Sequence, residues 1–307
     1  VYGYNIWDFL QKIGYTCNEK LNADLKGSFY RNKRDKRVGK MYQDIFLDYT
    51  LNGKVTYLPG EKQQLVIGYI YDNYQKNQDY FLSGKKTTDY RNIKQTPRID
   101  YTGTFGKHTV SVGFEGDFED LKHYMIEDIS HVNNQLYAFY AQEDWDILDE
   151  LNIVAGVRAD YHEKYHWHVT PKVSLLWHFC DHVSFRAGYA QGFRSPSLKE
   201  LYQAYDMGGM GWFMLYGNPD LKWQTQRQSN IGLDFGMMQD RFRMTFNYYR
   251  KRTKGMLTSI TVAPSLGFSS DSFTANLGEI KNVGYELNLN MVFIRDRSKD
   301  LEWAAFF

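Results

Sequence analysis

The sequence predicts an all-β fold, an antiparallel transmembrane β-barrel of which about 14 strands lie in this chain. Three observations predict it. Apolar and polar residues alternate with a period of two along many segments, as expected for strands whose two faces meet different surroundings. Aromatic residues make up 17% of the 307 residues, and aromatic side chains favour strands. Short turns and long connections follow each other in regular alternation along the chain.

Charge and hydropathy exclude two other classes of protein. The 37 basic and 36 acidic residues give a formal net charge of +1, which argues against a nucleic-acid partner. Mean hydropathy is -0.57, and no segment approaches the roughly 20 consecutive apolar residues of a transmembrane helix. The first residues contain no secretion signal, so we expect either a removed signal or a fragment of a longer chain.

The predicted strands have one apolar face and a second face unlike that of a soluble sheet. The second face carries Gly, Ser, Asn, Asp, Arg and Gln, which fits the polar interior of a wide barrel. We expect strands of roughly 8 to 14 residues, long enough for a tilted membrane crossing. The clearest segments, in chain order, are residues 21–30, 151–161, 183–189, 242–248 and 285–291.

The connections between these strands sort into two kinds that alternate with strand parity. Short turns are expected at residues 18–20, 106–107, 148–150, 181 and 239–240, and more loosely at 52–63 and 295–300. Long connections are expected at residues 32–41, 76–94, 122–133, 163–167, 193–226 and 253–279. Short turns on one rim and long loops on the other are typical of an outer-membrane barrel. Aromatic residues near strand ends, among them Tyr161, Trp167 and Tyr248, fit its interfacial girdles.

Three sequence boxes resemble those of a known family. The first is GFRSPSLKELY at residues 192–202, which resembles the Phe-Arg-Ala-Pro box of TonB-dependent outer-membrane receptors. The second is GNPDLK at residues 217–222, which is similar to the family's Asn-Pro-Asn-Leu box. A strand pair and the segment NVGYE at residues 282–286 follow. Three boxes in this order make the resemblance specific, and the strand rhythm extends it over the whole chain.

This resemblance implies a 22-stranded barrel that is closed by an N-terminal plug. The chain carries about ten expected strands before the first box and about four after the second. Residues 1–307 are therefore expected to be a partial TonB-dependent receptor β-barrel domain that lacks the plug and the terminal strands. The alternative is a complete 14-stranded barrel that ends with the aromatic Phe307.

The resemblance further implies a receptor and active transporter in the outer membrane of a Gram-negative bacterium. Such a protein contacts outer-membrane lipid, takes up a small metal chelate such as a ferric siderophore, heme or cobalamin, and is driven by the TonB complex through the plug. No covalently bound cofactor is expected. The alternatives are a passive porin-like or oligosaccharide-uptake barrel and a soluble β-rich carbohydrate-binding domain. The nucleophile-elbow, Walker and zinc-protease motifs are missing from the sequence, so no enzyme is expected.

The long connection at residues 193–226 is the predicted ligand-binding segment. It combines flat aromatic rings, which can pack against a macrocycle, with flexible thioethers, and phenolate or thioether atoms can ligate iron. The alternative is a loop that folds into the barrel mouth and packs on itself. The candidate residues are Tyr202, Tyr205, Met207, Met210, Trp212, Met214, Tyr216 and Arg194, whose guanidinium can clamp a carboxylate in the lumen.

Histidines provide the candidate metal ligands. His166 and His168 are two positions apart on an expected strand end, so both side chains are expected on the same side of it. The alternative is a pair of loop histidines that bind no metal. The segment between the first two boxes contains no histidine, which makes heme a less favoured ligand without excluding it.

Charged residues at alternate strand positions are expected on the inner wall of the barrel. We interpret them as a lumen network in contact with the plug rather than as a catalytic set. They are Glu115, Asp117, Arg158, Asp160, Arg186, Asp234 and Glu286.

Overall fold

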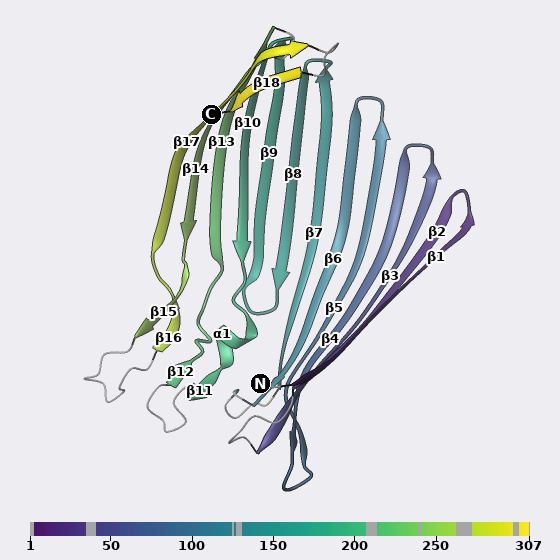
Figure 1. The fold of residues 1–307 in the computed structure, drawn as a ribbon, viewed down its shortest axis with the longest axis vertical. Coiled ribbons are helices and arrows are strands. Elements are labelled where there is room, and N and C mark those ends of the chain that lie inside the picture. The colour runs from purple at the N-terminus through teal and green to yellow at the C-terminus, as the bar shows by residue number, and fades with distance from the viewer. Residues whose placement is uncertain are drawn as a thin grey trace.

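The computed structural model describes residues 3–34, 41–124, 126, 131–206, 214–238, 241–261, 272–296 and 301–306. A single 14-stranded antiparallel sheet dominates it (Figure 1). A four-stranded sheet and one short helix lie near one end of the long strands. Each strand of the large sheet pairs with the next such strand along the chain, which makes the sheet an up-and-down meander. The prediction of an all-β fold with about 14 strands is confirmed.

The strands of the large sheet group around the two sequence boxes as predicted, ten before the first box and four after the second. The ten are β1 (Tyr4–Asn18), β2 (Leu21–Arg34), β3 (Tyr42–Gly60), β4 (Gln63–Tyr80), β5 (Lys86–Phe105), β6 (His108–His123), β7 (His131–Leu148), β8 (Leu151–His162), β9 (His166–Cys180) and β10 (Val183–Arg194). The four are β13 (Gln224–Met237), β14 (Phe242–Lys254), β17 (Glu279–Asp296) and β18 (Leu301–Phe306).

Two expected connections are wrong, because strands continue through them. The expected long connection at residues 76–94 is mostly strand, since β4 continues to Tyr80 and β5 begins at Lys86. These strand ends are polar on both faces, so a hydrophobic period cannot mark them. The loose turn expected at residues 52–63 shrinks to residues 61–62. There, Asn52 and Gly53 carry turn chemistry but pair with Ile70 and Tyr69 in the ladder.

The ladder register separates two faces of the large sheet. Phe114 pairs with Phe139 on the outer face, whereas Glu115 pairs with Ala138 on the inner face. Outer-face side chains are open to the surroundings, with Phe139 51% exposed and Tyr285 71% exposed. An apolar outer face and a polar inner face suit the wall of a barrel in lipid. Among the described residues, no helix has the length and apolar character needed to cross a membrane.

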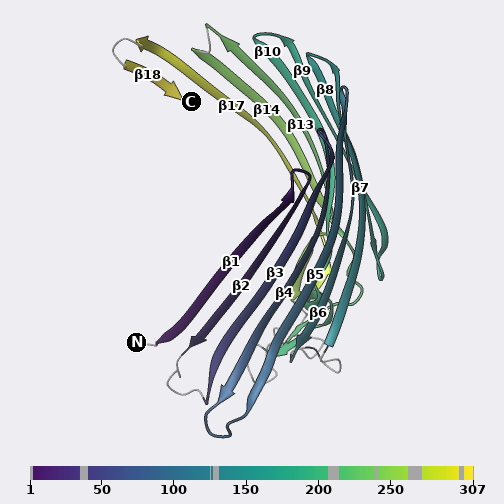
Figure 2. The ribbon, with the colours of Figure 1, turned by 90° about the vertical axis from the view of Figure 1, so that its right-hand side faces the viewer.

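The large sheet is strongly curved but open (Figure 2). Within the described segments, β1 pairs only with β2, and β18 pairs only with β17. The two rims of the sheet differ as predicted. One rim, at the top of Figure 1, carries the tight turns and is called the short-turn rim, and the other is called the long-loop rim.

Two long connections at the long-loop rim join in a second, small sheet. The connection after β10 forms α1 (Leu198–Tyr202), β11 (Ala204–Asp206) and β12 (Met214–Tyr216). The connection after β14 forms β15 (Leu257–Thr261) and β16 (Ser272–Asn276). These short strands pair in the order β11-β12-β16-β15, in which β12 and β16 run parallel. The alternation of apolar and polar residues did not predict this layer.

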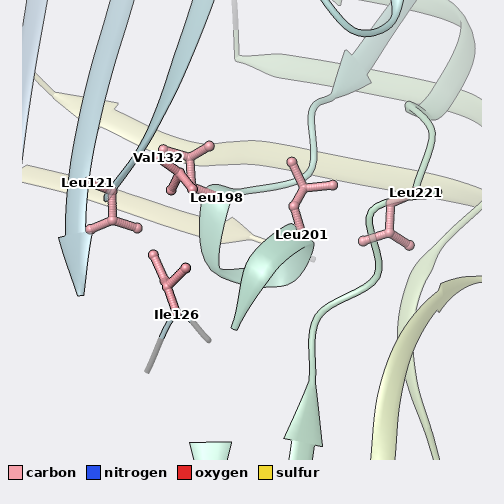
Figure 3. Close-up of a cluster of buried hydrophobic side chains, with 6 residues drawn as sticks. All are labelled: Leu121, Ile126, Val132, Leu198, Leu201 and Leu221. Carbon is pink, nitrogen blue, oxygen red and sulfur yellow. The ribbon is translucent and has the colours of Figure 1, made fainter. Parts of the chain in front are cut away.

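A compact apolar cluster attaches this layer to the large sheet (Figure 3). Leu121 of β6 and Val132 of β7 are partners in the ladder, and Leu121 lies an even number of positions from Glu115, which places both on the inner face. The helix α1 therefore packs over the inner face at the long-loop rim. The buried members are Leu121, Ile126, Val132, Leu198, Leu201 and Leu221.

Candidate functional site

The first sequence box supplies its own helix cap, which explains why α1 begins there. The Ser197 side chain accepts a hydrogen bond from the Glu200 backbone N–H at 3.3 Å, and the Glu200 carboxylate accepts one from the Ser197 backbone N–H at 2.8 Å. Arg194 donates to the same carboxylate at 2.8 Å. Burial would raise the pKa of Glu200, but the bonds from Ser197 and Arg194 hold that pKa below its usual range. Arg194 thus holds a carboxylate of its own chain.

The second box fixes the end of the same connection against α1. Gly217 donates its backbone N–H to the Gln203 carbonyl at 2.6 Å, and Asn218 donates its backbone N–H to the Glu200 carbonyl at 2.8 Å. A Cβ at Gly217 would lie 2.6 Å from the Leu201 carbonyl carbon, a contact with backbone that cannot move aside. The Asn218 side chain also donates to the Thr274 carbonyl in β16 at 3.0 Å. Both boxes therefore stabilise the layer on the inner face.

Aromatic and histidine rings surround Trp223, the residue that precedes β13. The centroid of its ring lies 5.6 Å from that of His162, 5.1 Å from Tyr165, 5.6 Å from His168 and 4.6 Å from Phe193. The indole N–H of Trp223 and the hydroxyl of Tyr165 are buried without a hydrogen-bond partner among the described residues. Unpaired buried donors are uncommon, which makes this cluster a candidate contact surface for a bound molecule. The sequence reading did not select Trp223, which lies just after the second box.

A second row of rings crosses the inner face beside α1. Tyr90 lies edge-on to both Tyr74 and His123, with centroid distances of 5.7 Å and 5.2 Å. His123 in turn stacks on Tyr124 at 5.1 Å. The ammonium group of Lys199 in α1 lies 4.5 Å from the centre of the Tyr90 ring, close enough for a cation–π contact.

Farther from the long-loop rim, a charged network covers the inner face of β5, β6 and β8. Arg158 donates to Asp160 at 3.0 Å and to Glu115 at 2.9 Å, as the sequence predicted for a lumen network. Arg98 donates to Asp100 at 2.6 Å and lies 3.8 Å from Glu115. A hollow of about 340 Å³ opens beside Arg98, Glu115 and Arg158.

The other predicted lumen charges lie in smaller contacts. Asp117 pairs with Lys94 at 2.9 Å, and Arg186 pairs with Asp234 at 2.6 Å. Glu286 lies opposite Asn247 in the ladder between β14 and β17. The predicted wall is therefore a set of local ion pairs.

The predicted ligand-binding residues fall in three groups. Tyr202 lies in α1, half-buried at the edge of the apolar cluster, and Tyr216 lies half-buried in β12. Tyr205 in β11 and Met214 in β12 are neighbours across the small sheet, in the pairs Tyr205–Leu215 and Asp206–Met214. Met207, Met210 and Trp212 lie outside the described residues. Their role in ligand binding stays a prediction.

The two candidate metal ligands have different neighbours. His166 opens β9 in a left-handed backbone conformation, with φ of 60°, and its ring lies 6.4 Å from that of Tyr161. The ring of His168 packs instead on Phe193 at 4.8 Å. Within the described part of the chain, no group of three or more His, Cys, Asp or Glu side chains is placed to hold a metal ion.

We expect the layer on the inner face to loosen as the pH falls from about 6.5 to about 4. Burial and, to a smaller extent, the charges of Lys199 and Lys76 lower the pKa of His123 to about 4. Burial and the charge of Lys164 likewise lower the pKa of His162 to about 4. Exposed histidine titrates near 6.5, so the undocked layer binds more protons than the docked layer in this range. For each of the two histidines, the free energy that favours docking falls by at most about 1.4 kcal/mol with each unit that the pH drops.

Hydrogen exchange of residues 194–206 and 214–224 in the full-length protein at pH 7 and pH 4.5 measures this loosening. Replacing His123 and His162 together by Gln should remove most of the pH dependence. The control is His178→Gln, because His178 is exposed at the short-turn rim. A pH dependence that persists in the double variant would contradict the assignment to these two histidines.

The large sheet is a meander of long strands with an apolar outer face, a charged inner face and folded loops at one rim. These features define the wall of an outer-membrane β-barrel. The chain belongs to the TonB dependent receptor-like β-barrel family, whose family model matches residues 1–306. The proteins of this family reside in the outer membrane of Gram-negative bacteria. The resemblance to TonB-dependent receptors that the sequence indicated is thus confirmed.

Relatives and solved structures agree with this membership. The iron-regulated outer membrane virulence protein of Vibrio cholerae is 23% identical over 300 residues, an alignment that covers 91% of this chain and 45% of that protein. The siderophore receptor PirA of Pseudomonas aeruginosa has the same fold, with a TM-score of 0.77 at 15% identity over 99% of this chain and 56% of that one. A mutant ferric enterobactin receptor of Pseudomonas aeruginosa gives a TM-score of 0.76 at 13% identity, over 99% and 50%. The chain spans about half the length of these proteins.

Proposed function

We propose that the whole protein captures an iron chelate, a ferric siderophore or heme, outside the cell and carries it across the outer membrane. The ordered layer over the inner face at the long-loop rim carries this proposal. It places aromatic and imidazole rings above a charged wall, on the side that faces the outside in barrels of this type. Relatives named as an iron-regulated outer membrane protein and as siderophore receptors support the choice of an iron chelate.

In this proposal, energy for uptake comes from the TonB complex through a plug inside the barrel of the whole protein. We assign contact with that plug to the charged network around Arg158 and Glu115, because this network lies on the inner wall. The proposal assigns no chemical reaction to the chain, since a transporter needs binding and passage rather than catalysis.

The ligand contacts are assigned to the connection after β10 together with the rings around Trp223. Flat rings pack against an extended organic chelate, and unpaired donors such as the Tyr165 hydroxyl and the Trp223 indole can bond to its oxygens. The same role is proposed for further residues of this connection, which are Tyr202, Tyr205, Met207, Met210, Trp212, Met214 and Tyr216. Cobalamin is a less favoured chelate in the same proposal.

Ligand titration of the full-length protein in detergent tests this function. Tryptophan fluorescence and absorbance are followed during titration with hemin, cobalamin, a catecholate siderophore and a hydroxamate siderophore. The two siderophores are loaded with iron before the titration. We expect a saturable response to one iron chelate. Changing Tyr205, Met210 and Tyr216 together to Ala should weaken it about tenfold, the scale of one or two lost ring contacts. Tyr69→Ala, which removes an aromatic side chain from the outer face, is the matched control.

Three results would count against the proposal. A response to cobalamin alone would change the ligand class. No response to any chelate would favour oligosaccharide uptake or a passive barrel. An equal loss in Tyr69→Ala would show that the response reports barrel stability rather than ligand contact.

A further inference from the structure

The outer face of three neighbouring strands changes abruptly in charge near the long-loop rim. From the short-turn rim toward the long-loop rim, the outward residues of β13, β14 and β17 are first apolar or aromatic and then mainly cationic, with Ser229, Thr225 and Glu279 among the cations. The apolar and aromatic residues are Phe235, Leu233, Ile231, Met244, Phe246, Tyr248, Leu289, Leu287, Tyr285 and Val283. The cations nearer the long-loop rim are Arg227, Arg250, Arg252, Lys254 and Lys281, and we call these five residues the cationic patch.

The ladder register brings the cationic patch together. Arg252 is the partner of Arg227 on one side and of Lys281 on the other, so three cations lie in one row across three strands. Arg250 lies two positions before Arg252 along β14, and Lys254 lies two positions after it. Because strands are spaced about 4.8 Å apart, these side chains reach a common surface.

Alternation along β14 shows that the patch faces outward. Asn247 accepts a hydrogen bond from Arg186 on the inner face, and a Cβ at Gly284 would meet the ring of Tyr249 on that same face. Even-numbered residues of β14 therefore point outward, as the ring contact of Tyr248 with the 71% exposed Tyr285 confirms. Arg250 has the same parity as Tyr248.

The patch carries more positive charge than its surroundings balance. Glu279 is the one carboxylate at its outward positions and accepts hydrogen bonds from Arg252, with an Nη2 to Oε2 distance of 2.8 Å. In the described residues, no other carboxylate lies within ion-pair distance of a patch residue. Outward positions of four other strands carry uncharged amides, Gln75 on β4, Gln95 on β5, Gln135 on β7 and Gln191 on β10. A smaller pair of outward cations, Arg91 and Lys122, lies across β5 and β6.

We infer that the cationic patch binds the phosphate groups of the lipopolysaccharide that forms the outer leaflet of the outer membrane. The patch lies between the long-loop rim and the apolar belt, next to the aromatic residues Tyr248 and Tyr285, which is where lipid headgroups meet a barrel. The planar fork of Arg pairs with phosphate oxygens, and four or more basic side chains form a site for an anionic headgroup. The acyl chains of the same lipid lie against Ile231 and Val283, which are 47% and 45% exposed.

Lipid A binding to the delipidated full-length receptor tests this inference. Arg250→Gln combined with Lys281→Gln removes two exposed patch cations that lie in no described ion pair. We expect this double variant to bind lipid A on the order of tenfold more weakly, from the contribution of basic residues near an anionic surface. Lipid A stripped of its phosphates should bind the unchanged receptor with a similar loss.

Two controls separate the patch from general effects. Lys251→Gln removes a cation from the adjacent inward position of the same strand and should leave lipid A binding unchanged. The double variant Arg250→Lys with Lys281→Arg keeps both positive charges and should bind lipid A nearly as strongly as the unchanged receptor. Each variant is first checked for folding by its heat-modifiable migration on a gel.

Two results would overturn the inference. Equal lipid A binding by the double Gln variant and the unchanged receptor would show that the patch holds no phosphate. Equal binding of phosphatidylglycerol vesicles and lipid A would show a surface for any anionic lipid rather than a site for the outer-leaflet glycolipid.

Discussion

Replacing Arg158 by Met is expected to destabilise the barrel wall by about 3 to 5 kcal/mol, because it leaves a buried carboxylate without its cation. The side chain of Asp160 is 0% exposed, and Arg158 donates to it while also donating to Glu115. Arg98 lies nearby, but its guanidinium is already bonded to Asp100. The free energy of unfolding of the full-length protein in detergent, from urea titration of tryptophan fluorescence, measures the loss.

An exposed ion pair of the same inner face provides the control. Lys94→Met removes the partner of Asp117, whose side chain is 32% exposed while that of Lys94 is 48% exposed. Such a pair contributes about 0 to 1 kcal/mol. Adding Asp160→Asn to Arg158→Met should recover much of the lost stability, because the unpaired charge is then gone. A loss in Arg158→Met no larger than that in Lys94→Met would contradict this account.

Replacing Leu201 by Asp is expected to undock the layer at the long-loop rim and to lower chelate binding at least tenfold. Leu201 is 3% exposed in the cluster between α1 and the inner face, whose buried members are all apolar. An unpaired charge in an apolar site costs several kcal/mol, more than a five-residue helix and its few contacts can compensate. The measurements are chelate titration and hydrogen exchange of residues 194–206.

The large sheet should survive this change, since its strands pair without the layer. The Leu201→Asp protein should therefore keep its heat-modifiable band, which separates undocking from a failure to fold. Leu201→Met, a replacement of similar volume, is the matched control and should cost less than about 1.5 kcal/mol. Normal chelate binding in Leu201→Asp would show that the ligand does not depend on the docked layer.

Local sequence signals were sufficient where neighbouring residues decide the structure. Alternation predicted β10, β14 and β17, because the period of two reports which face meets lipid and which meets the lumen. The same signal failed at the ends of β4 and β5, where both faces are polar and only ladder pairing extends the strands.

In the candidate site, too, some contacts follow from the local sequence and others depend on the tertiary structure. The pairing of Arg158 with Glu115 and Asp160 was predictable in kind, since all three occupy inward positions, Arg158 and Asp160 on β8 and Glu115 on β6, with only β7 between these strands. The contacts of Trp223 were not, because its ring neighbours come from β8, β9, β10 and the loop between β8 and β9. No period or motif records which of these residues meet.

The sequence by itself determined the antiparallel meander and its two chemically different faces. It also determined that short turns and long loops lie at opposite rims, and that ten strands precede the first box and four follow the second. These features follow from side-chain polarity and turn residues, which act over a few positions of the chain. Only the tertiary structure decided that the long connections fold into a layer over the inner face, and that five cations of β13, β14 and β17 form one outward patch. Such contacts depend on strand order and register, which bring together residues that are far apart in sequence and leave no local pattern.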